Sequence, residues 1–300
     1  MINKILQGDC LELFKTIPDD SFDVSFADPP FNLNKKYNSY KDKLSEQEYI
    51  DWCDLWLSEM VRVTKPTGSI FIHNIPKWSI HHASHLNKIA DFKNWISWKA
   101  LSGPPNKKCL QPGHYVILYY AKDGKQNKSY PIRSPHLRCR KCNYLSKDYG
   151  GKKYLIHPFG PKLSDVWTDL FRIRHKKKRD IHPCQLPPHL LERIILMSSD
   201  EGDIIFDPFL GTGTTAIASK KLGRRYCGFE KDKNYLKIAE DKINKETSSS
   251  KLGNSWVSYH LNKVITIRDK DWEDIEKSYN IPIFKNDIEH ISIKMEENSF

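Results

Sequence analysis

The chain has 300 residues, of which 39% are hydrophobic, and it carries a formal net charge of +11. This length suffices for one large α/β domain with insertions or for two domains. No stretch approaches the roughly 20 apolar residues of a membrane-spanning helix, and residues 1–6 show no signal-peptide pattern. Seven cysteines scattered over a large chain do not form a disulfide framework. We therefore expect a cytoplasmic protein that does not span a membrane.

The first part of the chain alternates apolar strands with helices. Strands are expected at residues 5–10, 22–27, 69–73, 95–100 and 114–120. A short helix is expected at residues 10–17, before Pro18. Ser45 and Glu48 have the spacing of a capping box, and the apolar residues that follow recur at helical spacing up to a stop predicted at residues 66–68. This alternation predicts a largely parallel sheet between layers of helices.

The basic excess lies in one segment, residues 121–180. This segment holds 17 Lys and Arg against five Asp and no Glu, a net charge of +12, so the rest of the chain sums to −1. A solvated basic face would account for the charge alone, but interleaved aromatic residues favour nucleic-acid binding. We interpret the segment as an inserted subdomain. Its densest cationic run is expected to contact phosphates, which gives affinity without reading sequence: Arg172, Arg174, Lys176, Lys177, Lys178 and Arg179.

The alternation resumes after the basic segment. A helix is expected at residues 190–197, a strand at 203–206, a helix at 214–222 and a strand at 226–229. Residues 245–255 are typical of a linker.

A rigid turn, Asp28-Pro29-Pro30-Phe31, follows the strand at residues 22–27. Two consecutive prolines end a strand, because neither donates a hydrogen bond and each fixes φ near −65°. In open α/β sheets, ligands bind at the carboxyl ends of the strands. The turn is therefore expected to present one carboxylate and one exposed aromatic ring, which together can hold a planar base and its amino group. The alternative is that Asp28 only caps the following loop.

A glycine loop, Asp207-Pro208-Phe209-Leu210-Gly211-Thr212-Gly213-Thr214-Thr215, connects a predicted strand to a predicted helix. Glu230 ends the next strand, 19 residues after Gly211. Glycine at such a turn lets a ligand approach the backbone, and the later acid can hold ribose hydroxyls, although tight packing alone also uses glycine. The loop lacks the third glycine of a dinucleotide site and the Gly-Lys-Ser/Thr of a phosphate loop. A nucleoside cofactor without pyrophosphate is predicted, with S-adenosylmethionine as the candidate.

The order of these two motifs resembles that of the amino-methylating (N6-adenine or N4-cytosine) DNA methyltransferases of the beta group, over about residues 3–243. The resemblance implies an α/β, Rossmann-like S-adenosylmethionine-dependent fold with a mixed, mostly parallel seven-stranded sheet. It also implies four parts: a catalytic half (1–120), a target-recognition insert (121–180), a cofactor half (181–244), and a linker with a small C-terminal extension (245–300).

The resemblance also assigns the site residues. Asp28, Pro29, Pro30 and Phe31 are the catalytic set: a flipped-out adenine stacks on Phe31, and Asp28 and the Pro29 carbonyl accept hydrogen bonds from its amino group. The methyl group then transfers directly in line, so catalysis comes from positioning and electrostatics. The cofactor residues are Asp9, Asp28, His182, Asp207, Phe209, Gly211, Gly213, Thr214, Thr215 and Glu230. The segment at 182–187 resembles the family's His-Pro-x-Gln-Lys-Pro, with Leu186 in place of Lys.

The aspartate of the turn favours adenine N6 as the target, with cytosine N4 as the alternative. Two other classes stay open: an oxidoreductase that binds NAD, and a DNA-binding regulator with an inactive methylase fold. The expected partner is double-stranded DNA in a prokaryotic nucleoid. The expected role is the modification enzyme of a restriction-modification system, beside a cognate endonuclease, as a monomer or homodimer.

Cysteine and histidine patterns give weaker signals. Cys139 and Cys142 have zinc-knuckle spacing, but structural zinc needs four ligands and no second Cys-x-x-Cys exists. Ordinary thiols are therefore expected and no metal is predicted. The alternative is a zinc site in which Cys139 and Cys142 are joined by ligands from among Cys109, His114, His136 and His157. His73 is interpreted as a satisfied strand-end histidine. The histidines of a predicted helix are interpreted as surface residues: His81, His82 and His85.

Overall fold

The computed structural model describes residues 2–34, 42–99, 110–130, 132, 162–170 and 185–246. The chain forms two compact units, Met1–Ser129 with Asp165–Ser248, and Tyr130–Ser164 with Ser249–Phe300. Every helix and strand named below belongs to the first unit. Several predictions fall outside the described residues: the cationic run at 172–179, Cys139, Cys142, His182, and all of the linker and extension after residue 246.

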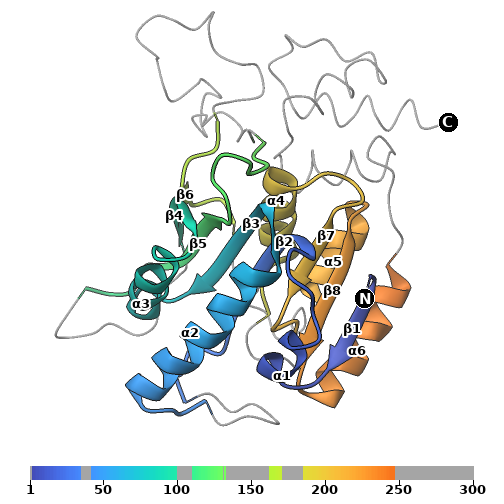
Figure 1. Cartoon of the computed structure of the whole chain (residues 1–300), viewed down its shortest axis with the longest axis horizontal. Helices are drawn as coiled ribbons and strands as arrows, with labels where there is room; N and C mark the ends of the chain where they lie inside the picture. Colours follow the sequence, from blue (N-terminus) through green and yellow to red (C-terminus); the bar gives the residue numbers. More distant parts are fainter. Residues whose placement is uncertain are drawn as a thin grey trace, which may run out of the picture. The chain divides into compact units, whose positions relative to one another are not determined.

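The first unit alternates strands and helices along the chain (Figure 1). The strands are β1 (Lys4–Gln7), β2 (Phe22–Ala27), β3 (Thr64–Asn74), β4 (Asp91–Lys99), β5 (His114–Ala121), β6 (Val166–Trp167), β7 (Ile204–Asp207) and β8 (Arg225–Glu230). The helices are α1 (Cys10–Phe14), α2 (Glu46–Val63), α3 (Pro76–Leu86), α4 (Pro188–Ser198), α5 (Thr214–Lys221) and α6 (Lys233–Lys245).

The described strands form one sheet in the order β1-β8-β7-β2-β3-β5-β4-β6. Neighbours from β1 to β3 are parallel, while β5 is antiparallel to both β3 and β4. The predicted mixed, mostly parallel sheet is therefore confirmed. The eighth strand is the two-residue β6, which pairs in parallel with β4 at Ser97 and Trp98.

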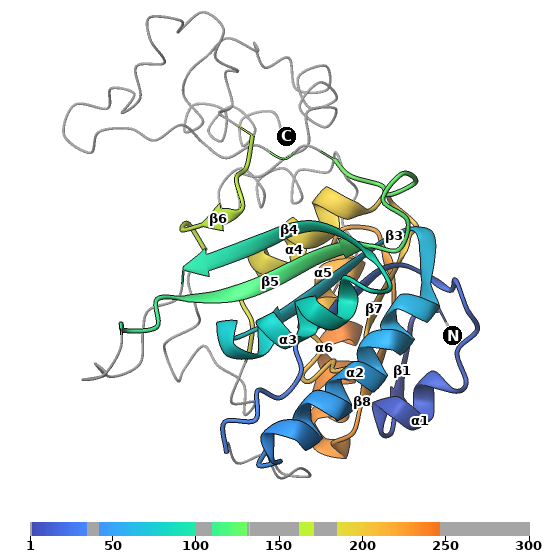
Figure 2. The ribbon, with the colours of Figure 1, turned by 60° about the vertical axis from the view of Figure 1, so that its left-hand side comes forward.

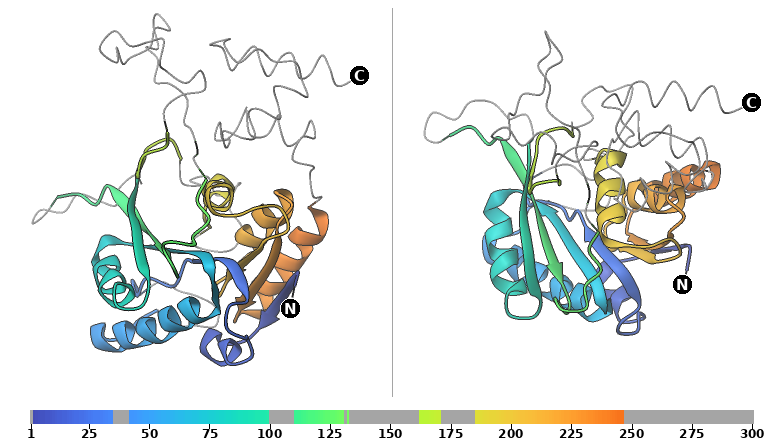
Figure 3. Two further views of the ribbon diagram at one scale, coloured as in Figure 1. Left: turned by 45° about the horizontal axis from the view of Figure 1, so that its top comes forward. Right: turned by 90° about the horizontal axis from the view of Figure 1, so that it is seen from above.

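Helices cover both faces of this sheet. α1, α2 and α3 lie on one face, and α4, α5 and α6 lie on the other (Figures 2 and 3). Because β1, β8, β7, β2 and β3 run in parallel, their carboxyl ends lie along one edge of the sheet, where a ligand site is expected.

Helix α2 begins where the sequence predicts. The Ser45 side chain accepts a hydrogen bond from the Glu48 amide, and the Glu48 side chain accepts one from the Ser45 amide, which completes the capping box. The predicted stop at residues 66–68 is wrong by a few residues, because α2 ends at Val63 and β3 starts at Thr64. A register shift between Phe22 and Val24 of β2 accommodates these extra residues of β3 as a bulge.

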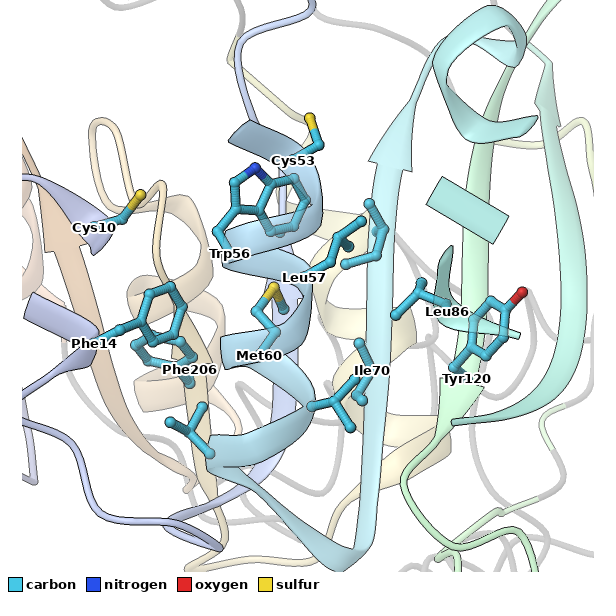
Figure 4. Close-up of a cluster of buried hydrophobic side chains, with 14 of the residues drawn as sticks. Cys10, Phe14, Cys53, Trp56, Leu57, Met60, Ile70, Leu86, Tyr120 and Phe206 are labelled. Carbon is cyan, nitrogen blue, oxygen red and sulfur yellow. The ribbon is translucent and has the colours of Figure 1, made fainter. Parts of the chain in front are cut away.

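A large hydrophobic cluster of the described residues lies between α1, α2, α3 and the sheet (Figure 4). Trp56, Leu57 and Met60 form the buried stripe of α2, as their helical spacing predicts. Phe14 of α1 makes edge contacts with the ring of Phe206 on β7, at a centroid distance of 5.5 Å. This packing holds α1 and α2 against the strands whose ends form the site.

Two features of the unit are not in the sequence-based expectations. Helix α6 was not predicted, although its N-cap, Asp232, accepts hydrogen bonds from the Asn234 and Tyr235 amides. β4 begins at Asp91 rather than 95, because the residues exposed at this end, Asp91, Phe92 and Asn94, do not form an apolar run that a sequence pattern would reveal. Among the described residues, no helix is long and apolar enough to cross a membrane.

The interpretation of His82 as a surface residue is wrong. His82 is 1% exposed, and its ring packs against Trp56 of α2 at a centroid distance of 5.8 Å. Burial lowers the pKa of His82 to about 3, with smaller contributions from the charges of His81 and His85. The side chain therefore stays neutral in the folded protein at pH values where it is protonated in the unfolded chain.

This difference predicts a pH-dependent stability. Because the folded-state pKa lies below the ordinary value of 6.5, stability is lost as pH falls from 6.5 towards 3, by about 2 kcal/mol between pH 7.5 and 5. In His82→Leu this part of the pH dependence is absent. Urea unfolding at the two pH values measures it, with His81→Leu on the same helix as the control. Equal pH dependence in wild type and His82→Leu would contradict the assignment.

Candidate functional site

Acidic residues from four neighbouring parallel strands meet at one edge of the sheet. Asp9 follows β1, Asp28 follows β2, Asp207 ends β7 and Glu230 ends β8. Together with the loops after these strands they line a cavity of about 210 Å³. Eleven of the predicted site residues line it: Asp9, Asp28, Pro29, Pro30, Phe31, Asp207, Phe209, Gly211, Thr214, Thr215 and Glu230.

Hydrogen bonds from two helices fix the double-proline turn. The Tyr49 hydroxyl of α2 donates to the Pro30 carbonyl at 2.6 Å, and the Trp78 indole of α3 donates to the Phe31 carbonyl at 2.7 Å. The chain after the turn is held as well, because the Asp42 carboxylate accepts from the amides of residues 32 and 33. The turn therefore has one conformation, set by groups far from it in sequence.

Two hydrogen-bond acceptors of the turn are left for a ligand. Asp28 Oδ1 is bonded to His73 Nδ1 at 2.7 Å. Within the described part of the chain, no donor reaches Asp28 Oδ2 or the Pro29 carbonyl. The Asp28 side chain is 16% exposed, so its carboxylate is accessible from the cavity that it lines. A carboxylate oxygen and an adjacent carbonyl can accept both hydrogens of one amino group.

The expectation of an exposed Phe31 ring is wrong. Phe31 is 7% exposed, and its ring lies 5.5 Å from the His73 ring and 6.1 Å from the Tyr115 ring. The ring is buried because it packs in an aromatic cluster with His73 and Tyr115, while the Trp78 indole holds the Phe31 carbonyl. The ring still contributes to the cavity wall.

His73 is a site residue that the sequence reasoning missed. It was interpreted as a satisfied strand-end histidine, but its partner is the carboxylate of the turn. A signal for this existed. In the parallel pairing of β2 and β3, Ala27 lies beside Ile72, so the next residues along the two strands are Asp28 and His73.

The glycine loop is held by two acidic side chains. Asp207 accepts from the Phe209 amide at 2.9 Å and from the Thr215 hydroxyl at 2.6 Å, which ties the end of β7 to the start of α5. Glu230 accepts from the Gly211 amide at 2.8 Å. Gly213 does not line the cavity; it precedes α5 with a φ of 88°, against Ala239 of α6.

Burial makes the cavity electrostatically unusual. It raises the pKa of Asp207 to about 7, with further increases from the charges of Asp28 and Glu230. It also raises the pKa of Glu230 to about 7. Lys231, which lines the mouth, pairs with Asp9 at 3.0 Å. A cationic ligand would relieve the repulsion among these carboxylates.

Aromatic side chains form the apolar wall of the cavity. Trp52 of α2 was interpreted only as a core position, but it lines the cavity and contacts the Phe209 ring at 5.7 Å. Asp232 and Tyr235 of the unpredicted α6 start also line it. Asp232 follows the predicted site residue Glu230 by two positions, so its place in the cavity wall could have been predicted from the sequence.

Part of the predicted basic segment is described, and two of its lysines there form ion pairs with residues of the sheet unit. Lys122 pairs with Asp20 at 2.5 Å and Lys128 pairs with Asp203 at 2.8 Å. Within the residues described here, no cluster of His, Cys, Asp and Glu could hold a metal ion. The phosphate contacts proposed for residues 172–179 remain a prediction.

Comparison with known proteins places this site in a family. Residues 22–241 match the family model described as DNA methylase (N6_N4_Mtase). The type II methyltransferase M.BamHI of Bacillus amyloliquefaciens is 43% identical over 271 residues, which is 90% of this chain and 63% of M.BamHI. M.BglII of Bacillus subtilis is 34% identical over 254 residues, or 79% of this chain and 68% of that protein. The chain thus spans less than two thirds of M.BamHI.

Solved structures share the fold. A putative DNA modification methylase of Thermus thermophilus, complexed with S-adenosyl-L-methionine, has a TM-score of 0.57 at 21% identity, covering 83% of this chain and 96% of that one. The cytosine-N4-specific PvuII DNA methyltransferase has a TM-score of 0.58 at 17% identity, covering 81% and 90%. S-adenosylmethionine is the methyl donor of the matched family. The chain belongs to the N6/N4 DNA methylase family.

Proposed function

We propose that this protein is an S-adenosylmethionine-dependent DNA methyltransferase that methylates an exocyclic amino nitrogen in double-stranded DNA. One observation carries the proposal. The fixed turn presents two acceptors that no donor of the described residues reaches, Asp28 Oδ2 and the Pro29 carbonyl, in the same cavity as the glycine loop. An oxidoreductase would leave this acceptor pair without a role.

The charge and the lining residues of the cavity suit the methyl donor. When bound, S-adenosylmethionine supplies an electrophilic methyl group on a positively charged sulfur. The carboxylates of Asp28, Asp207 and Glu230 favour a cation at this place. Glu230 already accepts from the Gly211 and Asp232 amides, which orients its remaining lone pairs for ribose hydroxyls. Trp52 and Phe209 give an apolar wall for the purine.

The turn supplies the chemistry at the base. An exocyclic amine has its lone pair delocalised into the ring, which makes it a poor nucleophile. When Asp28 Oδ2 and the Pro29 carbonyl accept its two hydrogens, the lone pair is drawn out of conjugation. The nitrogen gains the methyl group and releases one proton, for which Asp28 Oδ2 is the basic group on the turn. No covalent enzyme intermediate is needed, so positioning and electrostatics provide the rate enhancement.

The target base is proposed to be adenine, at N6, and to be flipped out of the duplex. Cytosine N4 is the alternative, because it too presents two amino hydrogens to the same acceptors. Phe31 is proposed to form the wall beside the base, and residues 121–180 to contact the DNA. Digestion of methylated DNA to nucleosides, followed by mass spectrometry, decides between the two bases. The type II methyltransferase relatives support a role in a restriction-modification system.

Replacement of the turn carboxylate tests the reaction. In Asp28→Ala we expect methyl transfer to fall by about 10²–10³-fold or more, because the amino group loses its charged acceptor. S-adenosylmethionine binding should change little. Transfer of labelled methyl to DNA and calorimetric binding measure the two effects, with Asp51→Ala on the exposed face of α2 as the control. Activity that survives Asp28→Ala would contradict the mechanism.

A glycine substitution tests the cofactor loop. Gly213 and Gly202 both have left-handed φ values, 88° and 82°, so alanine at either position costs about 1–2 kcal/mol. Only at position 213 does the new Cβ meet another residue, Ala239 Cβ at 2.9 Å, whereas nothing lies within 4 Å at position 202. Gly213→Ala is therefore expected to shift the loop and weaken S-adenosylmethionine binding. Each 1.4 kcal/mol of binding free energy lost in this way lowers the affinity about tenfold.

Gly202→Ala is the matched control for that experiment. It carries the same backbone strain, but it lies in the turn before β7, where no described residue lines the cavity. Its thermal stability should fall while its affinity for S-adenosylmethionine stays at the wild-type value. Equal affinities of the two variants would show that the loop does not hold the ligand.

A further inference from the structure

His73 lies beside the reaction centre in a fixed position. Its ring is held at the carboxyl end of β3, with centroid distances of 5.5 Å to Trp98 and 5.1 Å to Tyr115. Phe31 lies 5.5 Å away on the turn itself. The His73 side chain is 3% exposed. An imidazole enclosed in this way has very little freedom to rotate.

The hydrogen bonds of the ring define its protonation. His73 Nδ1 is 2.7 Å from Asp28 Oδ1, whereas His73 Nε2 is buried and has no partner among the described residues. A hydrogen on Nε2 would be a buried donor without an acceptor, which is unfavourable. An ionised carboxylate has no hydrogen to donate. The neutral ring with its hydrogen on Nδ1, donated to Asp28 Oδ1, satisfies both groups.

We propose that His73 is a positioning residue for methyl transfer: it holds Asp28 Oδ1, so that Oδ2 alone remains as the carboxylate acceptor for the target amino group. This inference rests on the proposed function. Without the bond from His73, either oxygen of Asp28 could rotate to the acceptor position. With it, the carboxylate plane is fixed before the base arrives, which lowers the cost of reaching the reactive geometry.

Among the described residues, the contacts of His73 give no path for relaying the proton of the reaction. A relay would need a second group at Nε2 to receive it, and none of the described residues reaches this atom. His73 therefore acts through Asp28 and does not contact the substrate. The expected effect of its removal is on turnover, not on cofactor binding.

Two substitutions separate this role from simple packing. His73→Phe keeps an aromatic ring against Phe31, Trp98 and Tyr115 but has no N–H. His73→Asn fills the space less well but retains an amide N–H near the position of Nδ1. If His73 positions Asp28, kcat falls by about 10- to 100-fold in His73→Phe, as expected for loss of one hydrogen bond to a charged group. In His73→Asn, kcat is at least partly restored.

A purely structural role predicts the opposite order. The phenylalanine would then be tolerated in the aromatic cluster, and the smaller polar asparagine would be harmful. The measurements are kcat and KM for DNA, S-adenosylmethionine affinity, and thermal stability of the full chain. Cofactor affinity should remain at the wild-type value in both variants. Wild-type turnover in His73→Phe, or higher turnover in His73→Phe than in His73→Asn, would overturn the inference while leaving the proposed function intact.

Nitrogen-15 NMR of the imidazole rings tests the contact without any activity assay. The signal of His73 is identified by its loss in His73→Asn, and we expect the Nδ1–H tautomer in the wild type. Observation of the Nε2–H tautomer would overturn the inference. Absence of methyl transfer by the wild type would instead contradict the proposed function, whichever tautomer is found.

Discussion

The site depends on the parallel pairing of β1, β8, β7 and β2. Parallel strands end at the same edge, so residues from the two ends of the described chain, Asp9 and Glu230, come to lie in one cavity with Asp28 and Asp207. β2 and β7, which are far apart in sequence, are parallel neighbours in the sheet. The double-proline turn after β2 and the glycine loop after β7 therefore line the same cavity.

Hydrogen bonds around the turn determine which of its oxygen atoms can accept a hydrogen bond from a ligand. Pro30 and Phe31 use their carbonyls to bind Tyr49 and Trp78, and Asp28 uses one oxygen to bind His73. Among the described residues, no donor reaches Asp28 Oδ2 or the Pro29 carbonyl, which come from adjacent residues. The chemistry proposed for this family member therefore depends on a hydrogen-bond network that occupies the neighbouring acceptors of the turn.

The acidic residues that hold the glycine loop are buried, which makes their ionised forms less stable than in water. Asp207 and Glu230 hold the glycine loop through backbone amides and a hydroxyl, although burial raises the pKa of both carboxyls to about 7. A positively charged ligand reduces the repulsion that their ionised forms would feel. Binding of such a ligand would therefore stabilise the ionised carboxylates and, with them, the loop that they hold.

The sequence by itself determined the elements with local signals: the strand at Phe22–Ala27 with its double-proline end, the capped start of α2, and the glycine loop. These depend on neighbours within a few residues. Only the tertiary structure decided that Phe31 is buried, that His82 lies in the core and that His73 binds Asp28, 45 residues away in sequence. The physical reason is that the burial and the partner of a side chain are properties of packed elements, and parallel strands place distant residues side by side.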